Sequence, residues 1–129
     1  MNPFSPHLLA LVAIGGAGGS LLRYATGIWC AGWFGTALPW GTLAVNVAGS
    51  AVIGLLGGLM LGGLAVSQEA RVLLITGILG GFTTFSAFSL DIGTLALRSP
   101  ALALGYLALT LLGGLGAFAL CFALGRVLA

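Results

Sequence analysis

The chain has 129 residues, of which 60% are hydrophobic and 5% are charged, and it carries a net charge of +2. A soluble domain has about one quarter charged residues, so this composition cannot cover a water-facing surface and excludes a soluble fold. The four basic residues are arginines scattered along the chain, too few for a nucleic-acid-binding surface. The composition therefore predicts an all-α integral membrane protein with no nucleic-acid partner.

Four apolar runs follow in chain order, each near or above the about 20 residues that cross a bilayer. They cover about residues 8–30, 41–66, 70–97 and 101–124. A tryptophan-rich loop separates the first two runs, as is typical of the membrane–water interface. The sequence predicts a single domain of four transmembrane helices, a multi-pass protein of the cell (inner) membrane in contact with the lipid bilayer.

The arginines bear on how the chain is oriented in the membrane. With four spans, Arg71 and Arg126 lie on one side, while Arg23 and Arg98 lie on the other. An excess of Lys and Arg on one side fixes orientation, and here neither side has an excess. The balance predicts a dual topology, which allows an antiparallel homodimer; the alternative is that another signal sets a single orientation.

The second and fourth runs each carry a stripe of polar and small residues spaced by four, which lies along one helix face. In the second run Asn46 places an amide at membrane depth, above a row of glycines suited to close helix packing. In the fourth run Tyr106, Thr110 and Gly114 make a similar face. Such side chains either line a pathway or only form hydrogen bonds between helices, and the spacing alone leaves both interpretations open.

No acidic, lysine or histidine side chain occupies the centre of any predicted helix. Without an acid–base pair, a nucleophile–base pair or a metal cluster, the sequence does not predict an enzyme. A small multidrug or guanidinium-type exporter, the main alternative, needs a carboxylate in its first helix, and residues 8–30 contain none. A membrane assembly subunit that transports nothing is a second alternative. Neutral polar groups, aromatic edges and backbone dipoles favour a channel.

The segment GGFTTFSAFS, residues 80–89, interrupts the third run with glycines and hydroxyl side chains. Gly80 and Thr83 lie where the helix is weakened, and we expect a break that frees backbone carbonyls, which suit a cation. Beyond the break, Phe85 and Phe88 share one face and can present their electropositive ring edges to a small anion. The alternative is that these phenylalanines only pack in the core.

Three motifs in order, GGAGGSLLRY (15–24), GTLAVNVAGS (41–50) and GGFTTFSAFS (80–89), together resemble the Fluc family of fluoride channels, also called CrcB. The resemblance covers essentially the whole chain. It implies a dual-topology antiparallel homodimer with two pores, through which cytoplasmic fluoride leaves the cell by passive flow.

The resemblance also implies roles for individual residues. A structural sodium ion (Na+) at the dimer interface is expected to be held by the backbone carbonyls of Gly80 and Thr83. Arg23 matches the first-helix arginine of the family. The expected fluoride pathway consists of Asn46, Phe85, Ser86, Phe88, Tyr106 and Thr110.

The sequence departs from the family pattern at two positions. Many members have Ser-Thr between the two phenylalanines, whereas this chain has Ser86-Ala87, so Ser86 is the only side-chain donor expected there. Gly114 likewise has no side chain where some members have a serine. Both departures remove a hydroxyl from the expected polar track.

Overall fold

The computed structural model describes residues 4–129, and all secondary structure in that range is helical. The elements, in chain order, are α1 (Pro6–Phe34), α2 (Trp40–Gly62), α3 (Gln68–Arg71), η1 (Val72–Leu79), α4 (Gly80–Phe82), α5 (Ser86–Arg98) and α6 (Pro100–Leu128). The π-helical segment η1 joins α3 to α4 without a gap, so α3, η1, α4 and α5 together form the third span, interrupted once.

Within residues 4–129, four helical stretches are long and apolar enough to cross a membrane: Pro6–Phe34, Trp40–Gly62, Gln68–Arg98 and Pro100–Leu128. The all-helical class and the four spans expected from the apolar runs are thus confirmed, and the chain is a multi-pass membrane protein. Helix starts follow local chemistry. Ser5 accepts a hydrogen bond from the Leu8 N–H at the start of α1, and Ser99 accepts one from the Leu102 N–H at the start of α6.

The second span is shorter than the apolar run that predicts it, because α2 ends at Gly62 rather than near residue 66. The next residue, Gly63, has a φ of 121°, a conformation that side chains rarely adopt. Its N–H donates back to the carbonyls of Leu59 and Met60, which closes the last helical turn. Apolar residues continue past this point, but they belong to the loop before α3.

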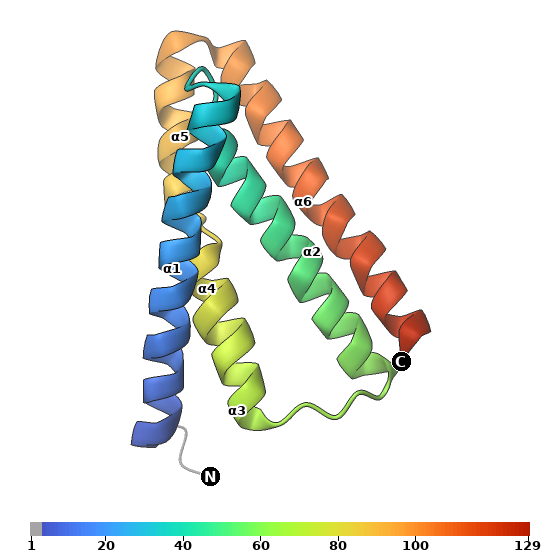
Figure 1. Ribbon diagram of the computed structural model, residues 1–129. Helices are drawn as coiled ribbons and strands as arrows, with labels where there is room; N and C mark the ends of the chain where they lie inside the picture. Colours follow the sequence, from blue (N-terminus) through green and yellow to red (C-terminus); the bar gives the residue numbers. More distant parts are fainter. Residues whose placement is uncertain (1–3) are drawn as a thin grey trace.

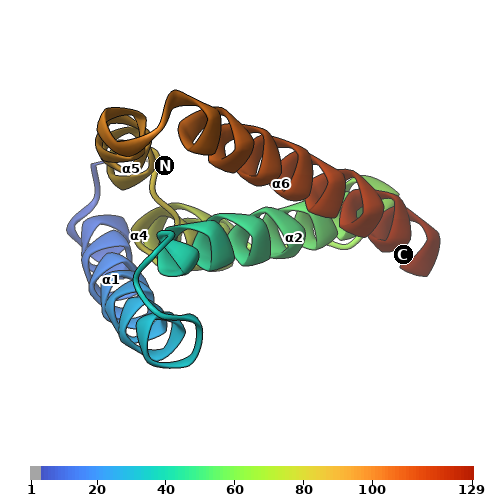
Figure 2. The same cartoon turned by 90° about the horizontal axis from the view of Figure 1, so that it is seen from above.

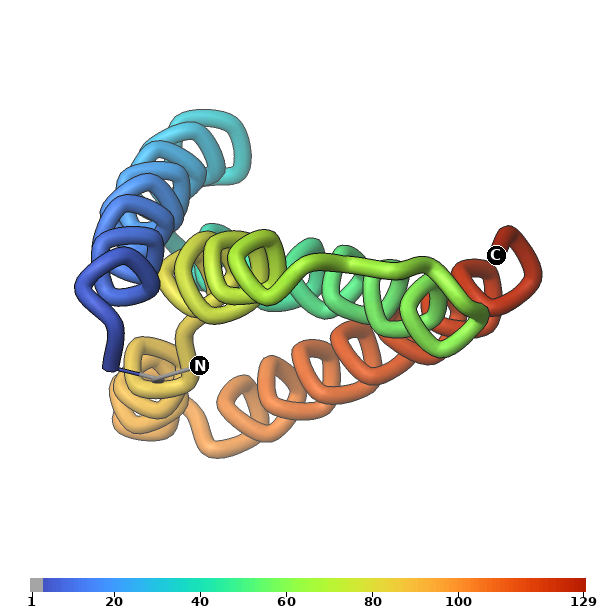
Figure 3. The backbone as a smooth tube through the Cα atoms, turned by 90° about the horizontal axis from the view of Figure 1, so that it is seen from below, coloured from blue at the N-terminus to red at the C-terminus, as the bar shows by residue number. Residues whose placement is uncertain are grey.

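The spans form two pairs that lie together at one end of the molecule and diverge toward the other (Figure 1). One pair is α1 with the segment α3–η1–α4, and the other is α2 with α6, which make the most extensive helix contact in the protein. Figures 2 and 3 show α2 between the third span and α6, with the extended segment that follows Gly62 bridging the diverging ends. The upper half of the third span, α5, packs on the start of α6.

Glycine permits the close approach within each pair. A Cβ at Gly19 of α1 would overlap the carbonyl oxygen of Ile78, and a Cβ at Gly58 of α2 would overlap that of Phe122. The first of these backbone contacts brings α1 against the end of η1, and the second brings α2 against α6. As a result, side chains from the neighbouring turn of α1 can reach the interruption of the third span.

Candidate functional site at the break in the third span

The third span is interrupted between Phe82, the last residue of α4, and Ser86, the first residue of α5. Thr83 is extended, with φ −82° and ψ 160°. Its N–H and its Oγ1 both donate to the carbonyl of Leu79, each at 3.0 Å. The peptide chain therefore leaves the helix at Thr83, where the sequence predicts a break.

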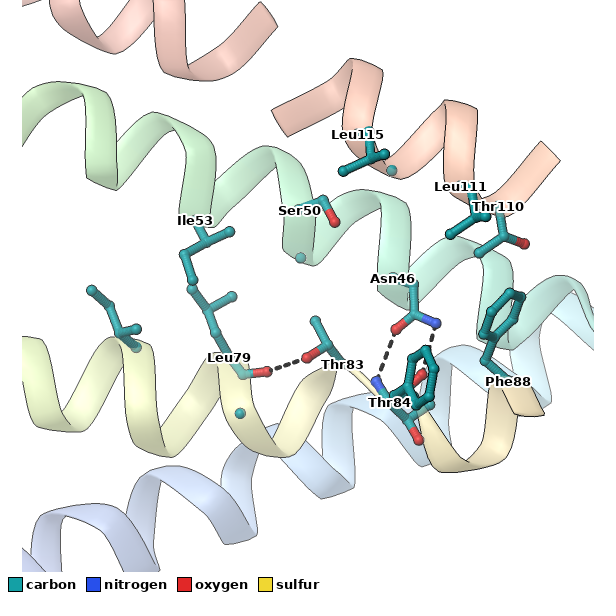
Figure 4. A pocket seen from close by; sticks show the side chains of 15 residues that line it. Asn46, Ser50, Ile53, Leu79, Thr83, Thr84, Phe88, Thr110, Leu111 and Leu115 are labelled. Atoms are coloured by element: carbon teal, nitrogen blue, oxygen red, sulfur yellow. Dashed lines mark hydrogen bonds between the residues drawn. The ribbon is translucent and has the colours of Figure 1, made fainter. Parts of the chain in front are cut away.

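Asn46 of α2 binds the backbone of the break at two points (Figure 4). Its Nδ2 donates to the Thr84 carbonyl at 2.9 Å, and its Oδ1 accepts from the Thr84 N–H at 2.8 Å. Thr84 is buried, and its own Oγ1 accepts from the Ala87 N–H at 3.2 Å, which caps α5. Because the Thr84 N–H bonds to Asn46, it does not reach the carbonyl of Gly80, the acceptor of the next helical turn.

Arg23 reaches the same break from the opposite side. Its Nη1 donates to the Thr83 carbonyl at 3.2 Å, across 60 positions of sequence. A guanidinium carries only donors, so a freed carbonyl is a suitable partner for it inside a membrane. The interruption is thus bound by α1 through the Thr83 carbonyl and by α2 through the N–H and the carbonyl of Thr84.

A hollow of about 380 Å³ opens beside the break, between α2, the third span and α6. Its lining has no charged side chain; amide, hydroxyl and carbonyl groups supply its polarity, and aliphatic and phenyl groups make up the rest. Residues predicted for the site that line the hollow are Asn46, Gly80, Thr83, Phe85, Phe88 and Thr110. Figure 4 shows Asn46, Phe88 and Thr110 toward one end of this space and Ile53 and Leu79 toward the other.

A row of three aromatic rings leads away from the hollow. The ring centroids of Phe85 and Phe88 are 6.0 Å apart, and those of Phe88 and Tyr106 are also 6.0 Å apart, both pairs tilted. Phe85 is 78% exposed, whereas Phe88 and Tyr106 are buried. The Tyr106 hydroxyl donates to the Pro39 carbonyl at 3.0 Å, in the connection between α1 and α2. The row joins the break to the start of α2.

Thr110 is buried in α6, and its hydroxyl has no hydrogen-bond partner among residues 4–129. A buried hydroxyl without a partner is uncommon, because its removal from water is then uncompensated. Since Thr110 also lines the hollow, this hydroxyl is one of the polar groups at its wall.

The match to known proteins extends over nearly all of this architecture. A family model described as CrcB-like protein, Camphor Resistance (CrcB), matches residues 10–124. The chain belongs to this family. It is 59% identical over 95 residues to the fluoride-specific ion channel FluC of Rhizobium leguminosarum bv. trifolii (strain WSM2304), covering 74% of this chain and 76% of the relative. It is 49% identical over 119 residues to that of Agrobacterium fabrum (strain C58 / ATCC 33970), covering 92% and 95%.

Not every residue expected for the pathway of a CrcB-like chain lines the hollow. Ser86 is exposed at the start of α5, and Tyr106 lies behind Phe88 with its hydroxyl bonded to Pro39. Arg23 contacts the break itself. The structure also brings in Thr84, which is not among the predicted site residues; it is 38 positions from Asn46, and no spacing rule joins residues so far apart.

Proposed function

We propose that this protein is a fluoride channel that lets cytoplasmic fluoride leave the cell by passive flow. The relatives described above are named fluoride-specific ion channels, and this name is the observation from which we take the identity of the ion. The hollow at the break supports conduction, because it combines neutral donors with a buried hydroxyl that has no partner in the described chain. Because the lining of the hollow has no charged side chain, it would not bind an anion too tightly to release it.

The proposed pathway runs along Asn46, Phe85, Ser86, Phe88, Tyr106 and Thr110. Fluoride is small and strongly hydrated, so the pathway must replace its water with donors. Hydroxyl groups and the electropositive edges of tilted phenyl rings can do this without a full positive charge. The N-terminus of α5, which begins at Ser86, adds the partial positive charge of a helix dipole beside the break.

We also propose that the channel is a dual-topology antiparallel homodimer with two pores and a structural sodium ion between the subunits. The carbonyls of Gly80 and Thr83, one pair from each subunit, would hold this ion. These ligands fit a sodium ion, because backbone carbonyls are hard oxygen ligands. The Gly80 carbonyl does not accept from the Thr84 N–H, since that N–H bonds to Asn46. The Thr83 carbonyl accepts from Arg23 and has a second lone pair for a cation.

Anion efflux from liposomes that contain the purified protein tests this function. Fluoride release, followed with a fluoride electrode, should be fast, should not need a proton gradient, and should far exceed chloride release. Collapse of the proton gradient with a protonophore should leave the fluoride rate unchanged. Release that stops when the gradient is collapsed would instead indicate a proton-coupled exporter, and equal chloride release would indicate an unselective pore.

A further inference from the structure

Both polar atoms of the Asn46 side chain are engaged by a single residue, Thr84. The amide donates to the Thr84 carbonyl at 2.9 Å and accepts from the Thr84 N–H at 2.8 Å. This is the pairing that a neighbouring β-strand would give to one residue of an extended segment. Here a side chain supplies it, at the one place in the third span where the backbone leaves the helix.

Thr84 needs this partner more than an exposed residue would. It is 9% exposed, so its N–H and carbonyl cannot exchange the amide for water without cost. In a continuous helix its N–H would instead bond to the Gly80 carbonyl, four residues earlier, and α4 would continue. The Thr84 N–H can bond either to Asn46 or to the Gly80 carbonyl. Because it bonds to Asn46, the Gly80 carbonyl does not accept from it.

We propose that Asn46 is a positioning residue that holds the third span open through Thr84. The proposal rests on the fluoride-channel function and specifies how Asn46 serves it. With Thr84 held, its Oγ1 caps α5 through Ala87, which fixes where α5 begins and therefore where Phe85 and Phe88 stand. One hydrogen of Nδ2 is used on Thr84 and the other remains, so the amide holds the break and still offers one donor to the pathway.

Hydrogen–deuterium exchange in fluoride-free buffer tests the contact itself. In Asn46→Leu, which is similar in size and has no polar atom, amides of residues 80–88 should exchange about tenfold faster than in the wild type. Residues 110–125 of α6 are the internal control and should be unaffected. Because no fluoride is present, a residue that acted only by touching the ion would leave the exchange unchanged, and that result would overturn the proposal.

The second arm uses Asn46→Asp, which can rebuild the contact only when protonated. A neutral carboxylic acid donates from one oxygen and accepts with the other, as the amide does, whereas a carboxylate cannot donate to the Thr84 carbonyl. Fluoride efflux of this variant should be at least about tenfold below wild type at pH about 8 and should recover most of that loss at pH about 5, since burial favours the neutral acid. Each rate is taken relative to wild type at the same pH after subtraction of protein-free liposomes.

The controls separate the possible results. Fluoride efflux of Asn46→Leu should be low at both pH values, since leucine has no group to protonate. If Asn46→Asp stays inactive at low pH although its residues 80–88 are protected from exchange as in wild type, the amide must contact the ion directly and the positioning role is wrong. If wild type itself releases no fluoride, the channel function fails, while the exchange experiment still decides the contact between Asn46 and Thr84.

Discussion

Phe85 and Thr110 are two side chains at this site whose contacts are incomplete in a single subunit. The Phe85 ring is 78% exposed although it lies at the centre of the third span. The Thr110 hydroxyl is buried but has no hydrogen-bond partner in the described chain. The buried hydroxyl costs free energy because it has been taken out of water without a partner, whereas the exposed ring is free to contact lipid or a second subunit. In the proposed channel, a second subunit and the ion supply the missing contacts.

Thr110→Val should separate stability from function. Valine has nearly the same shape and lacks the hydroxyl, so the free energy of unfolding should stay the same or rise by about 1 kcal/mol. Fluoride efflux should fall by about tenfold, because one donor is lost from the hollow. The matched control is Thr26→Val, whose hydroxyl is already bonded to the Leu22 carbonyl and which lies outside the hollow. Unchanged efflux in Thr110→Val would remove this hydroxyl from the pathway.

Phe85→Ile should lower fluoride efflux by about tenfold while sparing the fold of the subunit. Isoleucine keeps much of the volume but has no electropositive ring edge. Because Phe85 is largely exposed, the thermal unfolding midpoint should hardly change. Phe88→Ile should lower efflux as well, but with a loss of stability, since Phe88 is 5% exposed and packs on Tyr106.

A third phenylalanine serves as the control for both variants. Phe118 of α6 stacks on Phe122 and does not line the hollow, so Phe118→Ile should keep the wild-type efflux rate. Wild-type efflux in Phe85→Ile and Phe88→Ile as well would place the pathway elsewhere in the protein.

At the level of the elements, the third span shows how far sequence reasoning extends. Glycines and threonines in an apolar run predict the break, and the chain does leave the helix at Thr83. The same reasoning could not find what binds the break, because Arg23 and Asn46 reach it from positions 60 and 38 residues away. It also extended the second helix past Gly62, since apolar character continues where the positive φ of Gly63 ends the helix.

The structure distinguishes the two adjacent glycines at the break. A Cβ on Gly81 would overlap the Gly16 carbonyl of α1, whereas a Cβ on Gly80 would lie at an ordinary 3.7 Å from the Ile75 carbonyl. Gly81→Ala should therefore force α1 away from α4 and cost about 1–3 kcal/mol of stability. Gly80→Ala should leave the unfolding of the subunit unchanged. Chemical denaturation of the two variants compares them directly, and equal losses would contradict the packing described here.

At the level of the whole molecule, two helix pairs diverge from one end of the bundle (Figure 1), and the Phe85 ring beside the break stays exposed in a single chain. The arginines are distributed evenly, so neither orientation in the membrane is favoured by charge. A second subunit of opposite orientation could cover the break and the exposed Phe85 ring at once. This arrangement is the one proposed above, and it makes activity depend on both orientations being present.

Added charge should make that dependence visible. Lysines at Ser67 and Gln68, at the start of α3, should fix one orientation, and lysines at Thr36 and Ala37, between α1 and α2, should fix the other. Neither variant alone should conduct fluoride, whereas the two expressed together should restore efflux. Full activity of either variant by itself would contradict an obligatory antiparallel dimer.

The most direct test of the central claim is the reversal potential of the purified protein in a planar bilayer, with fluoride on one side and chloride on the other. A fluoride-selective channel carries current along the fluoride gradient alone, so we predict a reversal potential far from zero, with the sign set by fluoride, and no dependence on a pH difference. A reversal potential near zero would show equal passage of the two anions, and a potential that follows the pH difference would show proton coupling; either result would contradict the proposed fluoride channel.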